Sequence, residues 1–333
     1  MATTIPATEP VTALARDREA IRGAAVAAVG VSLPEQSISS AEIGARLGVG
    51  EHWIERRTGI RARRIAAPDE SLTEHAVRAA AAALERAGLG ADAVDLVLVA
   101  TTTADDVMPN AAPLVAHALG CTHAGAFDIG AACSGFLSAL AVGCGQIECR
   151  RARCAVVVGA DFMSRVTDPS DRATAAVFAD GAGAIVLVGA DEARIGPIVL
   201  GSDGAGAEHI HVRRERPLIF MQGHETFREA VARLSEATVQ AADAAGVGLD
   251  EIDLFVYHQA NGRILAAVGE RLGLAPDRVA DCIGEYGNTS AATLPLALEY
   301  SERHGQLRPG DHVLLGAFGA GFTWGATVLR WGI

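Results

Sequence analysis

The strongest chemical signature in the sequence surrounds Cys133, within the segment GAFDIGAACSGFLSAL of residues 125–140. An apolar run over residues 124–129 predicts a short buried strand, small residues then form a tight turn, and residues 134–146 predict a helix. A helix N-terminus carries unpaired N–H groups and a partial positive charge, which favour a thiolate over a thiol. Such a thiolate can attack a carbonyl while the same N–H groups receive the oxyanion. The alternative is a small buried cysteine in a tightly packed helix, and this stretch alone leaves both interpretations open.

Two polar residues in the second half of the chain extend this signature. His258 follows an apolar run at residues 254–257, which predicts a second buried strand, and Asn288 lies in GNTSAAT before another helix. Residues 87–100 align without gaps on residues 245–258, and the matches include both glycines and two aspartates. Because each copy lies between a long helix and a buried strand, we interpret the match as a duplicated α/β unit. The same offset brings the start of the cysteine helix onto the asparagine segment, so the two residues are expected at mirrored positions around one centre.

The elements that must position these residues are alternating strands and helices. Further buried strands are expected at residues 21–31, 94–101, 154–159, 182–188 and 326–331. Further helices are expected at residues 41–47, 71–87 and 226–245. A polar loop at residues 167–172 and glycine-rich loops at residues 202–208 and 316–325 separate them.

Composition limits the class of protein. At 333 residues the chain is long enough to bury a large core as two fused halves. Half of the residues are hydrophobic and 20% are charged, which is typical of a compact α/β enzyme and argues against a disordered chain. The net charge of −12 argues against nucleic-acid binding, because no face is expected to neutralise a row of phosphates.

Cysteine use and the N-terminal residues indicate a cellular compartment. The six cysteines include no CxxC pair and no cluster with histidines at metal-ligand spacing, so reduced thiols in the cytoplasm are expected. Residues 1–20 lack a long apolar core and are expected to be a disordered N-terminal extension rather than a signal peptide. No apolar run reaches membrane-spanning length, so no association with a membrane is expected.

A basic segment, EHWIERRTGIRARR at residues 51–64, stands out in this acidic chain. It is either a solvated basic face or an anion site in which Trp53 offers a stacking surface. The segment itself does not decide between the two.

Cys133 in AACSGF, His258 in HQANGR and Asn288 in GNTSAA together resemble the β-ketoacyl-acyl-carrier-protein synthase III family. Further stretches close to the family pattern follow in the same order, namely WIERRTGIRARRIA, ATTT, DPSDRAT, FADGAGA and FGAGFTWG. The resemblance covers roughly residues 22–333 and identifies the chain as a member of the thiolase-like superfamily.

The resemblance implies an α/β protein with the thiolase-like fold, in which two duplicated halves form a five-layer αβαβα arrangement. An N-terminal half at residues 21–190 would carry the nucleophile, and a C-terminal half at residues 191–333 would carry the histidine and the asparagine.

The resemblance also implies a two-stage reaction. Cys133 would take an acyl group from acyl-CoA as a thioester. Malonyl-acyl carrier protein would then lose CO2 and attack that thioester, giving a 3-oxoacyl carrier protein. His258 and Asn288 would donate hydrogen bonds to the enolate, and the N–H groups of Cys133 and Ala320 would form the oxyanion hole. The family usually has glycine where Ala320 stands. No metal or organic cofactor is expected, because loss of CO2 generates the carbanion.

Substrate-binding residues follow from the same resemblance. Trp53 and Arg172 match the pair that sandwiches the adenine of CoA, and Arg57 matches an arginine near the nucleotide phosphates. Each arginine has the alternative interpretation of an ordinary surface charge.

The tunnel and the acyl pocket have their own expected residues. Arg228 and Arg263 match basic positions around the tunnel mouth, and Asn261 is expected to be structural or to lie near the pantetheine path. Met108 and Phe178 are expected in the acyl pocket, with Met108 at the end that a second subunit contributes. Residues 206–222 are several residues shorter than in the family, so a more open or reshaped pocket is expected.

Acyl-CoA, an acyl carrier protein and a second copy of the chain are therefore the expected partners. The dimer is expected to bring the loop at residues 105–110 towards the neighbouring pocket. Three alternatives are an acyltransferase acting on an alcohol or amine, a thiol hydrolase with a Cys–His pair, and a non-catalytic partner subunit. Asn288 argues against plain acyl transfer, which needs no enolate-stabilising amide. The sequence leaves open the acyl chain, the carrier protein and the choice between a fatty-acid and a polyketide pathway.

Overall fold

The computed structural model describes residues 20–50 and 52–333. All but the last residue of the extension expected at residues 1–20 lies outside the described residues. Two sheets dominate the molecule, one formed by strands between residues 23 and 190 and one by strands between residues 199 and 330.

The first sheet has five strands in the order β1-β7-β6-β4-β5. Their bounds are Gly23–Ser32 for β1, Asp180–Ala190 for β7, Cys154–Phe162 for β6, Leu96–Ala100 for β4 and Gly125–Ile129 for β5. Strand β4 is parallel to both β5 and β6, and its last residue, Ala100, pairs with Ile129 and Gly159. The carboxyl ends of these three strands therefore meet at one edge of the sheet, immediately before the turn that carries Cys133.

The second sheet has four strands in the order β11-β12-β13-β8. Their bounds are Leu254–Tyr257 for β11, His312–Gly319 for β12, Thr323–Arg330 for β13 and Val199–Ser202 for β8. Strands β11 and β12 are parallel, and Tyr257 pairs with Gly316. This register places His258, the residue after β11, beside the C-terminal half of strand β12.

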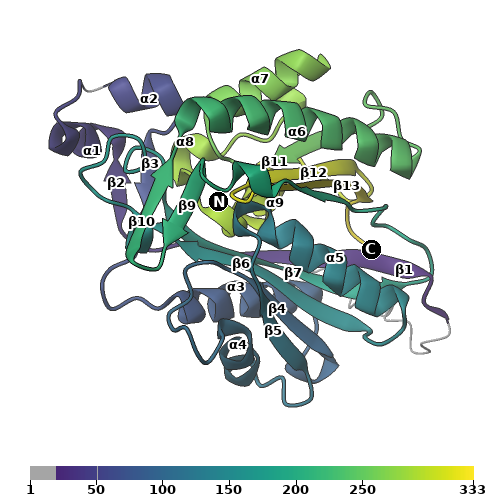
Figure 1. The fold of residues 1–333 in the computed structure, drawn as a ribbon. Helices are drawn as coiled ribbons and strands as arrows, with labels where there is room; N and C mark the ends of the chain where they lie inside the picture. The colour runs from purple at the N-terminus through teal and green to yellow at the C-terminus, as the bar shows by residue number, and fades with distance from the viewer. Residues whose placement is uncertain (1–19, 51) are drawn as a thin grey trace, which may run out of the picture.

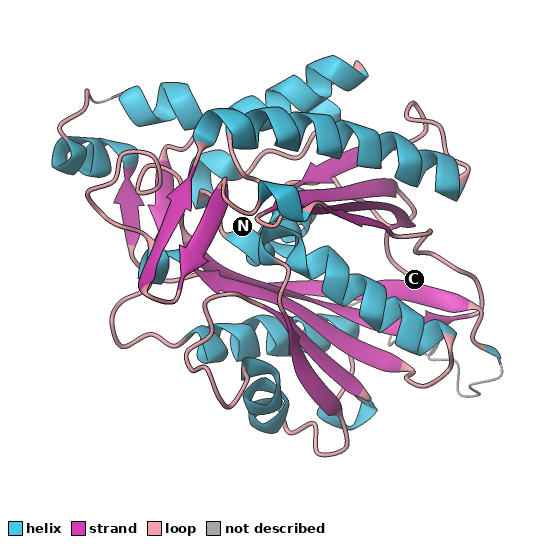
Figure 2. Cartoon of the chain, viewed as in Figure 1, coloured by secondary structure: helices cyan, strands magenta, loops and turns pink. Residues whose placement is uncertain are grey.

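Helices cover both sheets and fill the space between them (Figures 1 and 2). On the outer face of the first sheet lie α3 (Leu72–Ala87) and α4 (Ala111–Leu119). On the outer face of the second lie α6 (Gly223–Ala245) and α7 (Gly262–Leu272). Between the sheets lie α5 (Gly135–Glu148) and α9 (Thr293–Arg303). The predicted five-layer αβαβα arrangement is confirmed.

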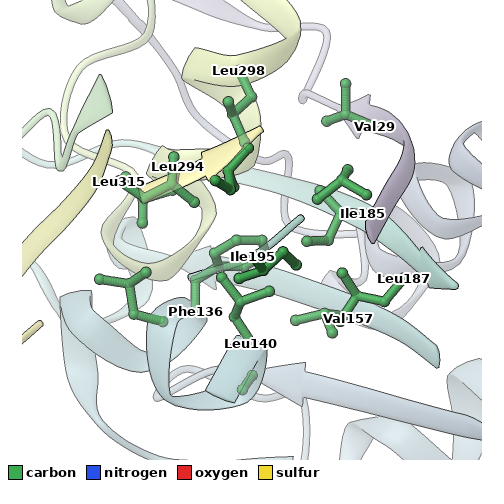
Figure 3. Packing of buried hydrophobic residues seen from close by; sticks show 14 of the residues in the cluster. Val29, Phe136, Leu140, Val157, Ile185, Leu187, Ile195, Leu294, Leu298 and Leu315 are labelled. Atoms are coloured by element: carbon green, nitrogen blue, oxygen red, sulfur yellow. The ribbon is translucent and has the colours of Figure 1, made fainter. Parts of the chain in front are cut away.

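The largest apolar core lies around the two central helices (Figure 3). Phe136 and Leu140 of α5 pack with Leu294 and Leu298 of α9 against side chains of both sheets. Close approach of the layers also requires glycine: a Cβ at Gly159 of β6 would lie 2.2 Å from the carbonyl oxygen of Ala291. The two halves therefore meet backbone to backbone next to the carboxyl edge of the first sheet.

Smaller elements project from the two sheets on the side of that carboxyl edge (Figure 1). They are β2 (Ser37–Ser39), α1 (Ser40–Leu47), α2 (Trp53–Thr58), β3 (Ala62–Arg64), the hairpin of β9 (Ile210–Arg213) and β10 (Arg216–Met221), and α8 (Ile283–Tyr286). Helix α1 begins with a capping box, in which the Ser39 hydroxyl accepts from the Glu42 N–H and the Glu42 carboxylate accepts from the Ser39 N–H. Ser71 caps α3 by accepting from the N–H of Glu74, as its position in the sequence predicts.

Two expectations about the strands are wrong. The strand at residues 124–129 is not buried, because β5 is an edge strand of the first sheet and Phe127 is 45% exposed. The glycine-rich stretch at residues 316–325 is mostly strand rather than loop. Gly319 belongs to β12, and a Cβ there would lie 2.8 Å from the nitrogen of Cys133. Gly319 therefore does not form a turn. It allows β12 to lie close to the backbone of Cys133.

None of the helices in the described part of the chain is long and apolar enough to cross a membrane.

Candidate active site

A cavity of about 890 Å³ opens where the carboxyl ends of the central strands meet. Cys133 from the first half lines it together with His258 and Asn288 from the second half. The structure thus brings the three residues of the predicted site to one cavity, although Cys133 is more than a hundred residues from the other two in sequence.

Cys133 lies in a short 3₁₀ turn, Ala132–Ser134, directly before α5. Its thiol lines the cavity but lies deep in the protein, and burial raises the pKa of Cys133 to about 11. The hydroxyl of Ser290 partly offsets this shift, and the carboxylate of Asp161 adds to it. In the free protein, burial therefore opposes the thiolate that a helix N-terminus favours.

His258 is neutral in this environment. The residue is 2% exposed, and burial lowers the pKa of its imidazole to about 3. Its backbone N–H donates to the carbonyl of Gly316 at 2.8 Å, which fixes the residue at the end of β11. Ring atom Nδ1 is buried without a hydrogen-bond partner among the described residues, so Nε2 is the ring nitrogen that can meet a ligand in the cavity. A neutral imidazole there can donate one hydrogen bond to an oxyanion.

Asn288 has its amide orientation set by two backbone groups. Its Oδ1 accepts from the N–H of Ser290 at 3.0 Å, and its Nδ2 donates to the carbonyl of Ala260 at 3.4 Å. Ala260 itself lines the cavity beside His258. The amide therefore turns its NH2 group towards the histidine side, with one hydrogen still available to a ligand.

Ala320 lies directly after β12 and lines the same cavity as Cys133. Its carbonyl accepts from the hydroxyl of Thr323 at 2.9 Å, which fixes the turn between β12 and β13. Because Gly319 packs against the backbone of Cys133, the two peptide units expected to form the oxyanion hole lie close together.

Asp161 accepts hydrogen bonds from both halves of the site. The sequence did not predict this role. The carboxylate is fully buried at the end of β6. Its Oδ1 accepts from the N–H of Thr102 and from the hydroxyl of Thr103, both at 2.8 Å. Its Oδ2 accepts from the N–H of Ala291 in the second half at 3.1 Å. The threonines stand in the ATTT motif, but nothing in the sequence pairs that motif with residue 161.

Most of the residues expected to bind CoA also line the cavity. Those that do are Trp53, Arg57, Arg172, Asn261 and Arg263. The guanidinium of Arg57 stacks over the Trp53 ring at 4.6 Å from its centroid, and Nε of Arg172 donates to the carbonyl of Leu47 at 3.1 Å. Part of the basic segment is therefore built against an aromatic surface at the cavity, rather than forming only a solvated face.

Asn261 and Arg263 join the second half to the basic segment. Asn261 is the N-cap of α7, and its side chain accepts from the N–H of Arg263 at 2.9 Å. The Arg263 guanidinium then donates to the carbonyl of Arg56 at 3.1 Å. These contacts give Asn261 a structural role and fix Arg263 next to α2.

Two expected site residues do not line this cavity. Arg228 is 69% exposed on α6 and pairs with Glu229 at 3.3 Å, although its neighbour Phe227 does line the cavity. Met108 is 84% exposed in the single chain. Phe178, the other residue expected in the acyl pocket, is buried and lines the cavity.

The β9–β10 hairpin supplies an apolar wall. Ile219 and Met221 of β10 line the cavity and pack in one cluster with Met163 and Phe178 of the first half. The segment at residues 206–222 thus contains a hairpin that forms part of the cavity wall. A thioester with an apolar acyl chain and a long polar handle matches this combination of apolar wall and basic rim.

Comparison with known proteins gives matches in both halves of the chain. A family model described as 3-oxoacyl-[acyl-carrier-protein] synthase III matches residues 127–204, and one described as the C terminal of that synthase matches residues 242–331. The β-ketoacyl-[acyl-carrier-protein] synthase III of Thermosynechococcus vestitus is 42% identical, with 93% of this chain and 99% of that protein covered. Synthase III 2 of Streptomyces coelicolor is 43% identical, with 93% and 94% covered.

Solved structures agree over nearly the whole chain. A crystal structure of 3-oxoacyl-(acyl carrier protein) synthase III from Pseudomonas aeruginosa PAO1 is 42% identical with a TM-score of 0.89, covering 94% of this chain and 99% of that one. The priming β-ketosynthase of the R1128 polyketide biosynthetic pathway is 37% identical with a TM-score of 0.91, covering 94% and 97%.

Proposed function

The chain belongs to the β-ketoacyl-acyl-carrier-protein synthase III family and has its thiolase-like fold, and on that premise we propose the reaction and the roles of its residues. The protein is a condensing acyltransferase that joins an acyl-CoA to malonyl-acyl carrier protein and forms a 3-oxoacyl carrier protein. The observation that carries the assignment of roles is the convergence of Cys133, His258 and Asn288 on one cavity.

In the first stage, Sγ of Cys133 attacks the carbonyl carbon of the acyl-CoA thioester. The tetrahedral oxyanion accepts from the N–H groups of Cys133 and Ala320. The intermediate then collapses by breaking the bond to CoA, and the proton of the Cys133 thiol ends on the departing CoA thiolate. The product is an acyl-cysteine inside the cavity.

In the second stage, malonyl-acyl carrier protein loses CO2, and the electrons of the broken C–C bond form an enolate. Its oxygen accepts from His258 and Asn288, both neutral donors. The enolate carbon attacks the carbonyl carbon of the acyl-cysteine, the C–S bond breaks, and the departing Cys133 thiolate takes a proton from solvent. Because CO2 loss supplies the carbanion, we propose that the reaction needs no metal and no organic cofactor.

Binding of CoA is assigned to the rim of the cavity. Trp53, Arg57 and Arg172 form one side of that rim and fit an adenine nucleotide with its phosphates. Arg263 and the exposed Arg228 are proposed for the phosphopantetheine arm of the carrier protein. Plain acyl transfer to an alcohol or amine is not favoured, because the relatives are condensing enzymes and the oriented amide of Asn288 has no role in it.

A two-step mass and gas measurement tests the reaction. Incubation with acetyl-CoA is expected to add one acetyl group to the peptide that contains Cys133, and addition of malonyl-acyl carrier protein is expected to remove it with release of CO2. A panel of acyl-CoA primers of different lengths then shows which acyl groups are transferred to Cys133. An adduct that malonyl-acyl carrier protein does not discharge contradicts condensation, and turnover by water alone indicates a hydrolase.

We further propose that the enzyme is a homodimer joined along β5. The strand is a sheet edge with free backbone groups and an exposed Phe127, and the loop before α4 carries Val107 and Met108 at 85% and 84% exposure. In the dimer Met108 would reach the neighbouring acyl pocket.

Sedimentation velocity is the test of the dimer. The wild-type protein is expected to sediment at twice its 34.3 kDa mass, and Phe127→Glu at the monomer mass. Leu200→Glu is the matched control, since Leu200 is 49% exposed on β8 at the edge of the other sheet and is expected to leave the dimer intact. A wild-type monomer at micromolar concentration contradicts the proposal.

The remaining assignments concern cell compartment and pathway. We place the enzyme in the cytoplasm, a proposal supported by its six unpaired cysteines. Both fatty-acid and polyketide initiation fit the reaction, and the primer panel distinguishes the acyl chains that each would use.

A further inference from the structure

We infer that Ser290 is a further catalytic residue of this site, whose hydroxyl stabilises the Cys133 sulfur whenever that sulfur carries negative charge. The inference rests on the proposed condensation, because it assigns Ser290 to the formation and the release of the acyl-cysteine. Oγ of Ser290 lies 3.5 Å from Sγ of Cys133 and donates its hydrogen to the sulfur. In the described part of the chain, no other side chain donates a hydrogen bond to this sulfur.

Hydrogen bonds to both halves of the molecule fix the backbone at Ser290. Ser290 is 1% exposed and lines the cavity with Cys133. Its own N–H donates to Oδ1 of Asn288 at 3.0 Å, and the N–H of Ala291 donates to Oδ2 of Asp161 at 3.1 Å. With its backbone fixed on both sides, Ser290 presents its side chain to the sulfur without reorganisation.

The duplicated unit offers an internal comparison. The offset that aligns residue 100 with residue 258 places Ala132 opposite Ser290, and each residue begins a 3₁₀ turn before a central helix. Both have left-handed backbones, with φ of 45° at Ala132 and 50° at Ser290. The left-handed conformation, unfavourable for both residue types, therefore belongs to the turn itself. What distinguishes Ser290 is the hydroxyl, which is present in the turn that faces the sulfur.

The chemistry requires such a donor twice. Burial keeps Cys133 a thiol in the free protein, yet its sulfur must carry negative charge when it attacks acyl-CoA and again when the condensed product leaves. A hydrogen bond to a charged acceptor is roughly twice as strong as one to a neutral acceptor, so the Ser290 hydroxyl favours the thiolate over the thiol. His258 and Asn288 serve the enolate, whereas Ser290 serves the sulfur.

The test compares Ser290→Gly with Ser301→Ala. Glycine adopts a positive φ without strain, so this variant removes the hydroxyl and keeps the turn. Ser301 is a buried serine at the far end of α9 whose hydroxyl has no hydrogen-bond partner among the described residues, which makes it the matched control. The measurement is the rate of iodoacetamide alkylation of the Cys133 peptide between pH 7 and pH 11, read by mass spectrometry, with acylation by acetyl-CoA in parallel.

The Ser290→Gly profile is expected to shift upward by about one pH unit, so that alkylation and acylation at pH 8 are both about tenfold slower. Ser301→Ala is expected to match the wild type. An unshifted profile in a folded Ser290→Gly protein overturns the inference, and Ser290→Ala, which keeps the Cβ, gives the same readout if the glycine variant does not fold. If the wild-type protein takes up no acetyl group, the proposed condensation fails, while the alkylation profile still decides the role of Ser290.

Discussion

Replacing Asn288 by alanine is expected to leave Cys133 able to form the acyl adduct and to slow CO2 release from malonyl-acyl carrier protein by about 100- to 1,000-fold. The reason is the orientation of the amide: Oδ1 is occupied by the N–H of Ser290, so the NH2 group is the end that faces the enolate. Alanine leaves His258 as the single side-chain donor for a charge that two donors share in the wild type. Intact-protein mass spectrometry measures the adduct, and a CO2 assay measures the second stage.

Asn288→Asp tests the hydrogen-bond donor of Asn288 separately from its contact with the backbone of Ser290. Aspartate keeps an oxygen that can accept from Ser290 but removes the NH2 group and adds a negative charge beside the developing enolate. Decarboxylation is expected to fall at least as far as in the alanine variant, with the adduct again formed. Wild-type CO2 release in either variant contradicts the role of Asn288, and loss of the adduct in both would show that the residue acts on the nucleophile instead.

Replacing Cys133 by alanine is expected to abolish the acyl adduct and to lower condensation by about four orders of magnitude or more. Decarboxylation of malonyl-acyl carrier protein is expected to persist in this variant, because the enolate donors His258 and Asn288 remain in place and do not involve the sulfur. The enolate is then protonated instead of acylated, so acetyl-carrier protein accumulates. Mass spectrometry of the carrier protein distinguishes this product from the 3-oxoacyl product.

Cys149→Ser is the matched control for the cysteine variant. Cys149 is an exposed thiol at the end of α5, so its loss is expected to remove off-site modification and leave condensation unchanged. Retention of the acetyl adduct in Cys133→Ala, or its loss in Cys149→Ser, contradicts the assignment of the nucleophile.

Physical patterns in the sequence were sufficient to predict a duplicated α/β unit with Cys133 and Asn288 at mirrored positions, whereas the five-layer fold and the roles of the three residues followed from the family resemblance. Small residues after Cys133 mark close helix packing, and short apolar runs mark buried strands such as β4, β6 and β11. The internal match between residues 87–100 and 245–258 then relates two strands that are distant in the chain. Cys133 and His258 each follow the carboxyl end of a strand, one in each sheet, and the packing of the two halves brings them to one cavity.

Properties that depend on three-dimensional context were not predictable. A helix N-terminus at Cys133 suggests a thiolate, but only the depth of the site shows that burial opposes it. A strand such as β5 looks buried in sequence because most of its residues are apolar, yet its position at the sheet edge decides its exposure. Asp161 and Ser290 were missed because their partners, Ala291 and Cys133, are more than a hundred residues away.

Gly159 shows that a position with no functional group can govern the chemistry. A Cβ at Gly159 would lie 2.2 Å from the carbonyl oxygen of Ala291, so even a methyl group would push the turn Ser290–Ala292 away from β6. That displacement would act on the turn bearing Ser290 and on the amide of Asn288, while every polar atom of the centre stayed chemically intact. In this enzyme, the lack of a side chain at Gly159 therefore sets the distance between the Cys133 sulfur and the groups that bind the enolate.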